Sequence, residues 1–351
     1  MKIAIIGGGF YGSYIANRLS KKYKITIFEK NSSILSEAAK YNQYRLHQGF
    51  HYPRSNETIK QTVDGYIKFK KEFKRYLYFP EDNYYLIHKK SLIDFKQYKK
   101  SFSKKFKFSI INPNLIKYLK NPKDYLGAVN TNEGVILLDK LLPRLKLNLK
   151  KKCTIKLNTY VRNIDANNGE IELVNKKKFR FDYIINCTYT NPNLGLKKDN
   201  QYNIKYELAA LVIPKIKIKN IPGITIMDGS FVSLYPRNME SFSISSVKFT
   251  PVKKFSKLLN AKLYLRKIKK KTFQNKVKKK IITDFQKYIN LEVNLSNSKV
   301  DFAIKTKFKK DTNDIRTANI KYNNRVASVM SGKLDAAPAI YEELLNYIKK
   351  I

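Results

Sequence analysis

The chain has 351 residues, of which 43% are hydrophobic, so it can bury a substantial core in one or two domains. Its 71 Lys and Arg against 27 Asp and Glu give a formal net charge of +44, which favours contact with nucleic acid, an anionic membrane surface or an acidic small molecule. The abundance of Lys, Asn, Ile, Tyr and Phe without any Trp also fits an AT-rich genome, although that bias leaves the shortage of acidic residues unexplained.

Cysteine usage and hydropathy indicate the compartment. Cys153 and Cys187 have no metal-binding or redox spacing, which predicts free thiols, no metal site and a reducing compartment. No apolar run approaches the roughly 20 residues of a membrane-spanning helix, and the amino terminus lacks a secretory-signal pattern. We therefore expect a cytoplasmic protein, with peripheral contact at the inner membrane as an alternative.

The chain opens with a predicted strand and a glycine-rich turn. Residues 3–6 (IAII) form a continuously apolar run, typical of a parallel strand covered on both faces. Gly7, Gly9 and Gly12 follow as G-x-G-x-x-G. The first glycine permits a tight turn, the second lets the backbone approach a pyrophosphate, and the third lets a helix pack close to the strand.

The next residues complete a dinucleotide-binding unit. A helix is predicted from Phe10, with its free amide groups directed at the phosphates. A second strand, residues 24–28, ends at Glu29, where a carboxylate can accept hydrogen bonds from an adenosine ribose. Strand, turn, helix, strand and acid together predict dinucleotide binding, but they do not separate NAD from FAD.

Residues 41–66 (YNQYRLHQGFHYPRSNETIKQTVDGY) concentrate hydrogen-bonding side chains. Arg45, His47, His51 and Tyr52 lie close together beside a glycine and a proline, and two of the chain's three histidines are among them. Such a density favours a functional site, and the alternative is a network that only holds a loop together.

At these residues the chain resembles the FAD-dependent oxidoreductases of the D-amino acid oxidase superfamily, closest to the L-2-hydroxyglutarate oxidase-type branch. Residues 47–53 (HQGFHYP), followed by Ser55, are similar to that branch's segment along the flavin. Three further stretches resemble the family in its own order. They are residues 127–145, similar to a short turn and helix, residues 181–193, similar to the late strand that closes the FAD sheet, and residues 325–344, similar to the carboxy-terminal flavin-contacting element.

The resemblance implies an α/β fold with a Rossmann-like FAD-binding domain of the GR2 type. A substrate domain of the α+β class, built on an antiparallel sheet, would be inserted into it. The FAD-binding domain would be discontinuous and comprise residues 1–80, 130–205 and 316–351. The substrate or cap domain would comprise residues 81–129 and 206–315.

The resemblance also implies roles for single residues. Its catalytic candidates are His47, His51, Tyr52 and Arg316, and His47 is alternatively a covalent tether for the flavin. The family's carboxylate-gripping residues have no assured position here, so Arg316 is our candidate anion clamp, with an exposed surface ion pair as the alternative. The implied cofactor-binding residues are Gly7, Gly9, Phe10, Tyr11, Gly12, Glu29, Lys30, Asn42, Arg45, Leu46, His47, Gly332, Lys333 and Leu334.

Residues 206–250 alternate apolar and polar side chains between turn signals, which predicts strands of an antiparallel sheet. As in the resembled family, we expect this sheet to cover the reactive face of the flavin. Tyr235 and Arg237 are candidates to project toward substrate, and sheet packing is the alternative for Tyr235.

A lysine-rich segment follows. No acidic residue lies between Glu240 and Asp284, while Phe273, Val277 and Ile281 recur every four residues. This pattern predicts an amphipathic helix with a lysine face. That face is either simply solvated or a contact surface for anionic lipid or an acidic polymer.

Together these patterns predict an FAD-dependent oxidoreductase that takes a hydride from the C–H beside an amine or hydroxyl of a small anionic substrate, an amino acid or 2-hydroxy acid. His47 and His51 are acid/base or flavin-contact candidates, because imidazole changes protonation near neutral pH. Two alternatives remain. One is FAD-dependent modification of a sugar or nucleotide sugar in a surface-polysaccharide pathway. The other is nucleic-acid binding, which the charge and 25 tyrosines support although the sequence has no RNP, zinc-finger or helix-turn-helix pattern.

Overall fold

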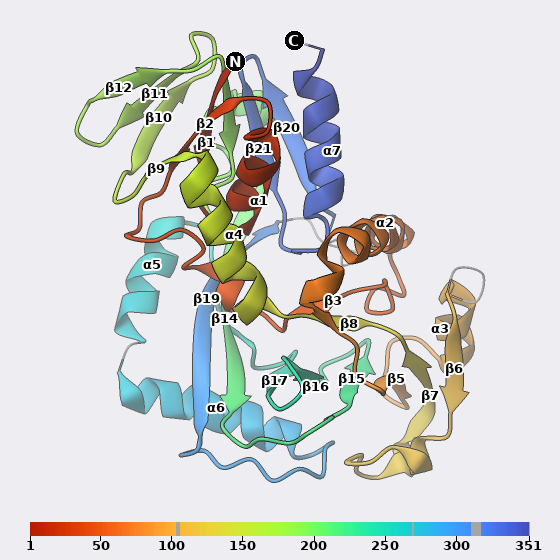
Figure 1. The fold of residues 1–351 in the computed structure, drawn as a ribbon. Coiled ribbons are helices and arrows are strands. Elements are labelled where there is room, and N and C mark those ends of the chain that lie inside the picture. The colour runs from red at the N-terminus through yellow and green to blue at the C-terminus, as the bar shows by residue number, and fades with distance from the viewer. Residues whose placement is uncertain (103–105, 269, 310–316, 351) are drawn as a thin grey trace.

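The computed structural model of the chain describes residues 1–102, 106–268, 270–309 and 317–350. Two β-sheets organise it, one in the upper half of Figure 1 beside both termini and a larger one in the lower half. None of the described helices is both long and apolar enough to cross a bilayer.

The upper sheet is mainly parallel, as the glycine-turn pattern predicts. β1 pairs in parallel with β2 and β13, β13 pairs in parallel with β21, and only the edge strand β20 is antiparallel. In the described residues its strand order is β20 (Asn319–Asn323), β21 (Val326–Met330), β13 (Tyr183–Asn186), β1 (Lys2–Ile6), β2 (Lys24–Phe28) and β9 (Thr154–Lys156).

Both faces of β1 are covered, which explains its continuous apolar run. Ile3 and Ile5 pack on the helical side, whereas Ala4 and Ile6 pack against a small three-stranded sheet. The helices on the first side include α1 (Phe10–Leu19), α2 (Asn56–Phe73), α4 (Leu138–Lys152) and α7 (Ala337–Ile348), and the small sheet consists of β10 (Val161–Asp165), β11 (Glu170–Leu173) and β12 (Lys178–Arg180).

The lower sheet is mixed. Residues 206–250 form the predicted strands, and β14, β16 and β17 pair antiparallel, but β15 pairs in parallel with β5. Along the sheet the described strands are β18 (Pro251–Phe255), β14 (Ile204–Pro214), β17 (Phe242–Ser246), β16 (Val232–Pro236), β15 (Gly223–Met227), β5 (Asn83–His88), β7 (Tyr125–Thr131) and β6 (Phe108–Ile111), with β19 (Ser298–Phe308) paired to β14. The expectation of a wholly antiparallel sheet was therefore wrong for β5 and β15, whose parallel pairing needs a long connection between them.

Side-chain alternation gives the lower sheet one apolar and one polar face. Leu234 and Ile244 lie in the apolar cluster with helix α6 (Lys271–Phe285), which confirms the predicted amphipathic helix. On the opposite face, Ser233 and Ser245 accept hydrogen bonds from Gln43 of the upper half at 3.2 and 3.1 Å. The polar face is therefore directed toward the nucleotide-binding half.

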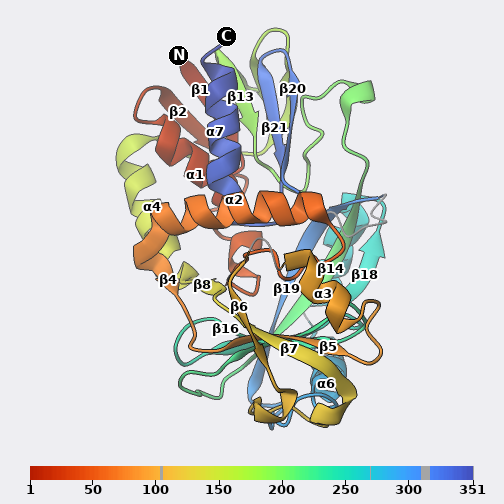
Figure 2. The ribbon, with the colours of Figure 1, turned by 90° about the vertical axis from the view of Figure 1, so that its right-hand side faces the viewer.

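A small sheet and helix α2 join the two halves. Figure 2 shows α2 running across the molecule between the upper and lower sheets. The side chain of Ser55 caps α2 by accepting a hydrogen bond from the Thr58 amide at 3.3 Å, as short polar residues do at helix starts. The joining sheet has the order β3 (Arg45–Leu46), β8 (Gly134–Ile136) and β4 (Leu77–Tyr78).

Two resembled segments differ in detail from expectation. Residues 127–131 belong to strand β7, and the turn at Asn132 and Glu133 leads into strand β8, which precedes helix α4. Strand β13 lies inside the upper sheet beside β1, with β21 and β20 beyond it. The remaining elements are the helices α3 (Phe95–Phe102) and α5 (Leu258–Lys267) and the 3₁₀ turns η1 (Ala38–Lys40), η2 (Lys74–Tyr76), η3 (Pro113–Leu115), η4 (Pro122–Asp124) and η5 (Lys198–Asn200).

Candidate functional site

The three glycines of the first turn have different steric environments. Gly7 has a φ of +98°, a left-handed conformation that favours glycine. A Cβ atom on Gly12 would clash with the carbonyl oxygen of Gly7, so Gly12 lets the helix approach the strand. A Cβ atom on Gly9 would meet no heavy atom within 4 Å. Space is therefore open in front of Gly9, where the helix begins.

Glu29 is held at the end of β2 by backbone amides. Its carboxylate is buried and accepts hydrogen bonds from the amides of Gly8 at 2.7 Å and Asn31 at 2.9 Å. The neighbouring Lys30 forms an ion pair with Glu37 at 2.8 Å. This arrangement fixes the carboxylate next to the glycine turn.

The turn that follows β21 lies against the start of α1. The Tyr11 hydroxyl donates to the carbonyl of Lys333 at 2.6 Å. A Cβ atom on Gly332 would have only the Tyr189 hydroxyl, at 3.8 Å, as a neighbour within 4 Å. A second open space thus borders residues 331–333, which come from the far end of the chain.

His47 and Glu133 form a pair between the two halves. Glu133 Oε2 lies 3.7 Å from His47 Nδ1, the Glu133 side chain is fully buried, and the His47 side chain is 15% exposed. Glu133 also accepts hydrogen bonds from the Gln48 amide at 2.7 Å and from the Tyr85 hydroxyl at 2.5 Å. The His47 amide donates to Asp335 Oδ2 at 3.3 Å. Four segments that are distant in sequence therefore meet around His47.

The two carboxyl groups around His47 have opposite pKa shifts. For Glu133, burial acts to raise the pKa, but the nearby imidazole of His47 and the hydrogen bond from Tyr85 outweigh burial, and the pKa is lowered. For Asp335, burial raises the pKa, and the attraction of His47 and Lys333 only partly opposes it. Glu133 is thus the carboxylate held in its ionised form beside the imidazole.

Arg45 is a buried cation with free hydrogen-bonding capacity. Its side chain is 7% exposed, and its Nη1 atom donates to Thr225 Oγ1 at 2.8 Å. The guanidinium carbon lies 4.0 Å from the centroid of the Tyr235 ring. Its Nε and Nη2 atoms are buried without a hydrogen-bond partner among the described residues. Buried guanidinium groups are normally paired, so this one is able to bind an anion.

Aromatic rings surround the imidazole of His47. The ring centroid of His51 lies 5.6 Å away, and that of Tyr52 lies 5.8 Å away. The Lys333 ammonium lies 4.0 Å from the Tyr52 ring centroid and donates to Thr62 Oγ1 at 2.6 Å. The predicted residues His47, His51, Tyr52 and Lys333 are therefore brought together.

Other predicted residues have structural surroundings. Phe10 and Leu46 have buried side chains in the upper core, and Leu334 packs against that core. The Asn42 side chain accepts a hydrogen bond from the Tyr44 amide at 2.7 Å and shapes the turn before β3. Arg316 lies outside the described residues.

Tyr235 and Arg237 both belong to the polar side of the lower sheet. The Tyr235 hydroxyl donates to the carbonyl of Gly134 at 2.8 Å, and its ring lies under Arg45. The Arg237 guanidinium lies 3.8 Å from the Tyr44 ring centroid and donates to the carbonyl of Asn42 at 3.3 Å. Both side chains therefore contribute to the contact between the two halves.

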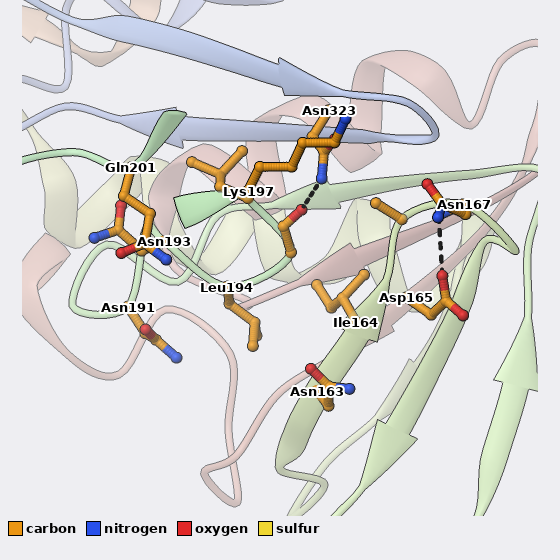
Figure 3. Close-up of a pocket in the computed structure, with 13 residues that line it drawn as sticks. Asn163, Ile164, Asp165, Asn167, Asn191, Asn193, Leu194, Lys197, Gln201 and Asn323 are labelled. Carbon is orange, nitrogen blue, oxygen red and sulfur yellow. Dashed lines mark hydrogen bonds between the residues drawn. The ribbon is translucent and has the colours of Figure 1, made fainter. Parts of the chain in front are cut away.

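An open hollow of about 520 Å³ lies elsewhere on the surface (Figure 3). Asn163, Asp165 and Asn191 contribute to its polar lining, and Asn323 donates to the carbonyl of Gly195 at 2.8 Å. None of the predicted site residues lines this hollow. The described residues also contain no group of three or more His, Cys, Asp or Glu side chains arranged to hold a metal ion.

Comparison with known proteins assigns the family. The family model for DAO, FAD dependent oxidoreductase, matches residues 2–260. The chain belongs to this family. It is therefore an FAD-dependent oxidoreductase, as its sequence predicts.

Three similar proteins illustrate the range of the family. The FAD-dependent monooxygenase FPY4 of Fusarium mangiferae is 28% identical over 359 residues, which cover 99% of this chain and 90% of the relative. The solved structure of NikD, an unusual amino acid oxidase, has a TM-score of 0.76 and 9% identity, covering 97% of this chain and 91% of NikD. The L-alpha-glycerophosphate oxidase of Mycoplasma pneumoniae with FAD bound has a TM-score of 0.71 and 18% identity, covering 98% and 93% of the two chains. The two structures share the fold with this chain.

Sequence reasoning did not single out Glu133, Asp335, Tyr85 or Thr225. Glu133 carried one visible signal, because it is an isolated acid between Asn132 and a glycine, directly before the apolar run of residues 135–138. The contacts of the other three depend on pairings between segments 40 to 288 residues apart, which no local pattern reveals.

Proposed function

We propose that the glycine turn, Glu29 and the turn at residues 331–333 hold FAD. The open spaces in front of Gly9 and Gly332 support this proposal, because added side chains there would meet almost no protein atoms. The start of α1 offers amide groups for the pyrophosphate, and the buried Glu29 carboxylate suits a ribose. When bound, FAD supplies hydride acceptance.

We further propose that the enzyme oxidises the C–H bond beside an amine or hydroxyl of a small anionic acid. The observation that carries this proposal is a buried cluster around the short strand β3. Arg45 belongs to that strand, His47 follows it directly, and Glu133 approaches His47 from the turn before β8. The resemblance of residues 47–53 to the L-2-hydroxyglutarate oxidase-type branch favours a 2-hydroxy acid.

In this mechanism His47 accepts the hydroxyl or amine proton at Nε2. Glu133 lies on the Nδ1 side of the ring and stabilises the imidazolium that results. The pKa of Glu133 is lowered by the nearby imidazole of His47 and by the hydrogen bond from Tyr85, so the carboxylate stays charged while the imidazole gains its proton.

Arg45 grips the anionic group of the substrate. Its free Nε and Nη2 atoms give the two-pronged geometry that a carboxylate accepts. The candidate for this role among the described residues is therefore Arg45, which the resemblance alone would assign to the cofactor.

The first test is an anaerobic absorbance spectrum of the purified protein with a panel of D- and L-amino acids and 2-hydroxy acids. We expect a flavin band that one 2-hydroxy acid bleaches, and much slower bleaching in His47→Asn. The matched control is His88→Asn, because His88 lies in an aromatic cluster with Tyr125 and Phe231 on the apolar side of the lower sheet. A flavin band that no acid bleaches would contradict the proposed substrate class. Release of the colour on acid precipitation would exclude the covalent tether at His47.

A second candidate function comes from the relative that covers nearly the whole chain, which is named an FAD-dependent monooxygenase. A monooxygenase of this kind needs an external reductant and transfers an oxygen atom from O₂ to its product. NADH or NADPH would then bleach the flavin where the acids do not, and isotopically labelled O₂ would enter the product. Turnover of nucleotide sugars in the same assay tests the sugar-modifying alternative.

A further inference from the structure

Helix α5 presents two leucines to solvent. Leu259 is 65% exposed and Leu263 is 46% exposed, and their four-residue spacing puts both on one side of the helix. Only Ala261 is buried on α5. Figure 1 shows the helix at the edge of the molecule, outside strands β14 and β19. Single exposed leucines are common, but here two adjoin on one helix.

Basic residues lie along α5 and the segment before it. We define the α5 face as Leu259 and Leu263 together with the exposed cations of α5 and the strand before it, namely Lys253, Lys254, Lys257, Arg266 and Lys267. The sequence from 241 to 283 contains no acidic residue. The α5 face thus combines apolar side chains with a dense positive charge.

Lys262, on the same helix, is partly buried next to other charged side chains. Its pKa is lowered, first by burial and then by repulsion from Lys30 and Arg266, while Glu37 acts in the opposite direction. A bound anion would relieve this repulsion. The positive charge at α5 is therefore only partly balanced within the protein.

We propose that the α5 face docks on the surface of an anionic phospholipid bilayer. Leu259 and Leu263 enter the boundary between headgroups and acyl chains, and the lysines and arginine contact lipid phosphates. Basic helices with an apolar side bind membranes in this way, and each cation near an anionic leaflet contributes on the order of 1 kcal/mol. A nucleic acid would attract the cations equally, but its phosphates give exposed leucines no apolar phase to enter.

A second pair of exposed leucines provides a matched control. Leu115 is 76% exposed and Leu126 is 49% exposed, but these two are not on one helix and Asp124 lies between them in the chain. Replacing this pair removes slightly more exposed leucine surface without touching α5.

The test is flotation of the FAD-loaded protein with vesicles of phosphatidylcholine, alone or in an equimolar mixture with phosphatidylglycerol. We expect the protein to float with the mixed vesicles and not with phosphatidylcholine, and to dissociate as salt rises. Leu259→Gln/Leu263→Gln should lower the partition by about tenfold or more, whereas Leu115→Gln/Leu126→Gln should bind as the unmodified protein does. Equal flavin content verifies that both variants fold.

Three results would overturn the proposal. One is absence of flotation with the anionic vesicles at low salt. Another is a Leu259→Gln/Leu263→Gln variant that floats as well as the unmodified protein, because the leucines would then play no part. The third is binding to duplex or single-stranded DNA that persists at about 0.15 M salt without vesicle binding, which would assign the basic surface to nucleic acid.

Discussion

Replacing Arg45 by Met should make the protein more stable and less active at once. The guanidinium is buried with two nitrogen atoms unpartnered among the described residues, and Met fills a similar volume without a charge. Removing a buried ionic group in favour of an apolar one is often neutral or stabilising by about 1–4 kcal/mol. The loss of the hydrogen bond to Thr225 and of the contact with the Tyr235 ring offsets part of that gain. We expect a change in unfolding free energy between zero and about +2 kcal/mol.

The effect on activity has the opposite sign. If Arg45 holds the anionic group of the substrate, its loss leaves a buried anion unpaired, a change that typically weakens binding by about 2–5 kcal/mol. At 1.36 kcal/mol per tenfold change, kcat/KM should fall by about 30-fold to several thousand-fold.

Two measurements on the FAD-loaded protein decide between a functional and a structural arginine. Urea unfolding gives the free energy, and anaerobic flavin bleaching gives kcat/KM. If Arg45 is purely structural, Arg45→Met should lower the unfolding free energy by about 1–3 kcal/mol, because the buried Thr225 hydroxyl loses its partner, and that result would refute the reasoning. Arg18→Met is the control, because Arg18 is 35% exposed and pairs with Glu72 at 3.3 Å, so the change should be below about 1 kcal/mol with kcat/KM unaltered.

Gly9→Val should fold normally but purify without flavin colour, since its side chain enters open space next to the start of α1; retained flavin would contradict the placement of the cofactor. Gly12→Val should instead lose about 1–3 kcal/mol or more of stability, seen as a lower thermal midpoint, because its Cβ atom would clash with the Gly7 carbonyl. Because the folded-state pKa of Glu133 is lowered from 4.5, ionised Glu133 stabilises the fold above that pH, and this contribution is lost as pH falls through the folded-state pKa. Glu133→Gln should therefore lower the unfolding free energy at neutral pH by about 1–3 kcal/mol and weaken its acid dependence, which urea titrations at several pH values measure; an unchanged pH profile would show that another group governs it.

The nucleotide-binding half was predictable because its signals are local. The run IAII, the three glycines and Glu29 lie within the first 29 residues, and each follows from backbone sterics or hydrogen bonding of its own segment. The strands of residues 206–250 were predictable from alternation, but their partners were not. The parallel pairing of β5 with β15 joins segments more than a hundred residues apart. The alternation of apolar and polar side chains along a strand does not tell whether its neighbour runs parallel or antiparallel.

The arrangement around His47 escaped sequence reasoning for the same physical reason. The resemblance placed His47 and Arg45 along the flavin, but their chemistry depends on what lies opposite. Glu133 reaches His47 from the turn before β8, and Thr225 reaches Arg45 from the lower sheet. Neither of these two contacts can be predicted from the motif residues alone.

In the proposed mechanism the substrate balances the positive charge of Arg45. Glu133 has a lowered pKa and pairs with His47. Burial raises the pKa of Asp335, so Asp335 takes up a proton more readily than Glu133 does. In the part of the chain that the structure describes, neither of these carboxyl groups forms an ion pair with Arg45. Among the described residues, the Nε and Nη2 atoms of Arg45 have no hydrogen-bond acceptor. Environments that push the pKa values of two carboxyls apart commonly assign them different tasks. In the proposed mechanism, therefore, the His47–Glu133 pair takes the proton, and the unpaired Arg45 guanidinium binds a substrate that brings its own negative charge.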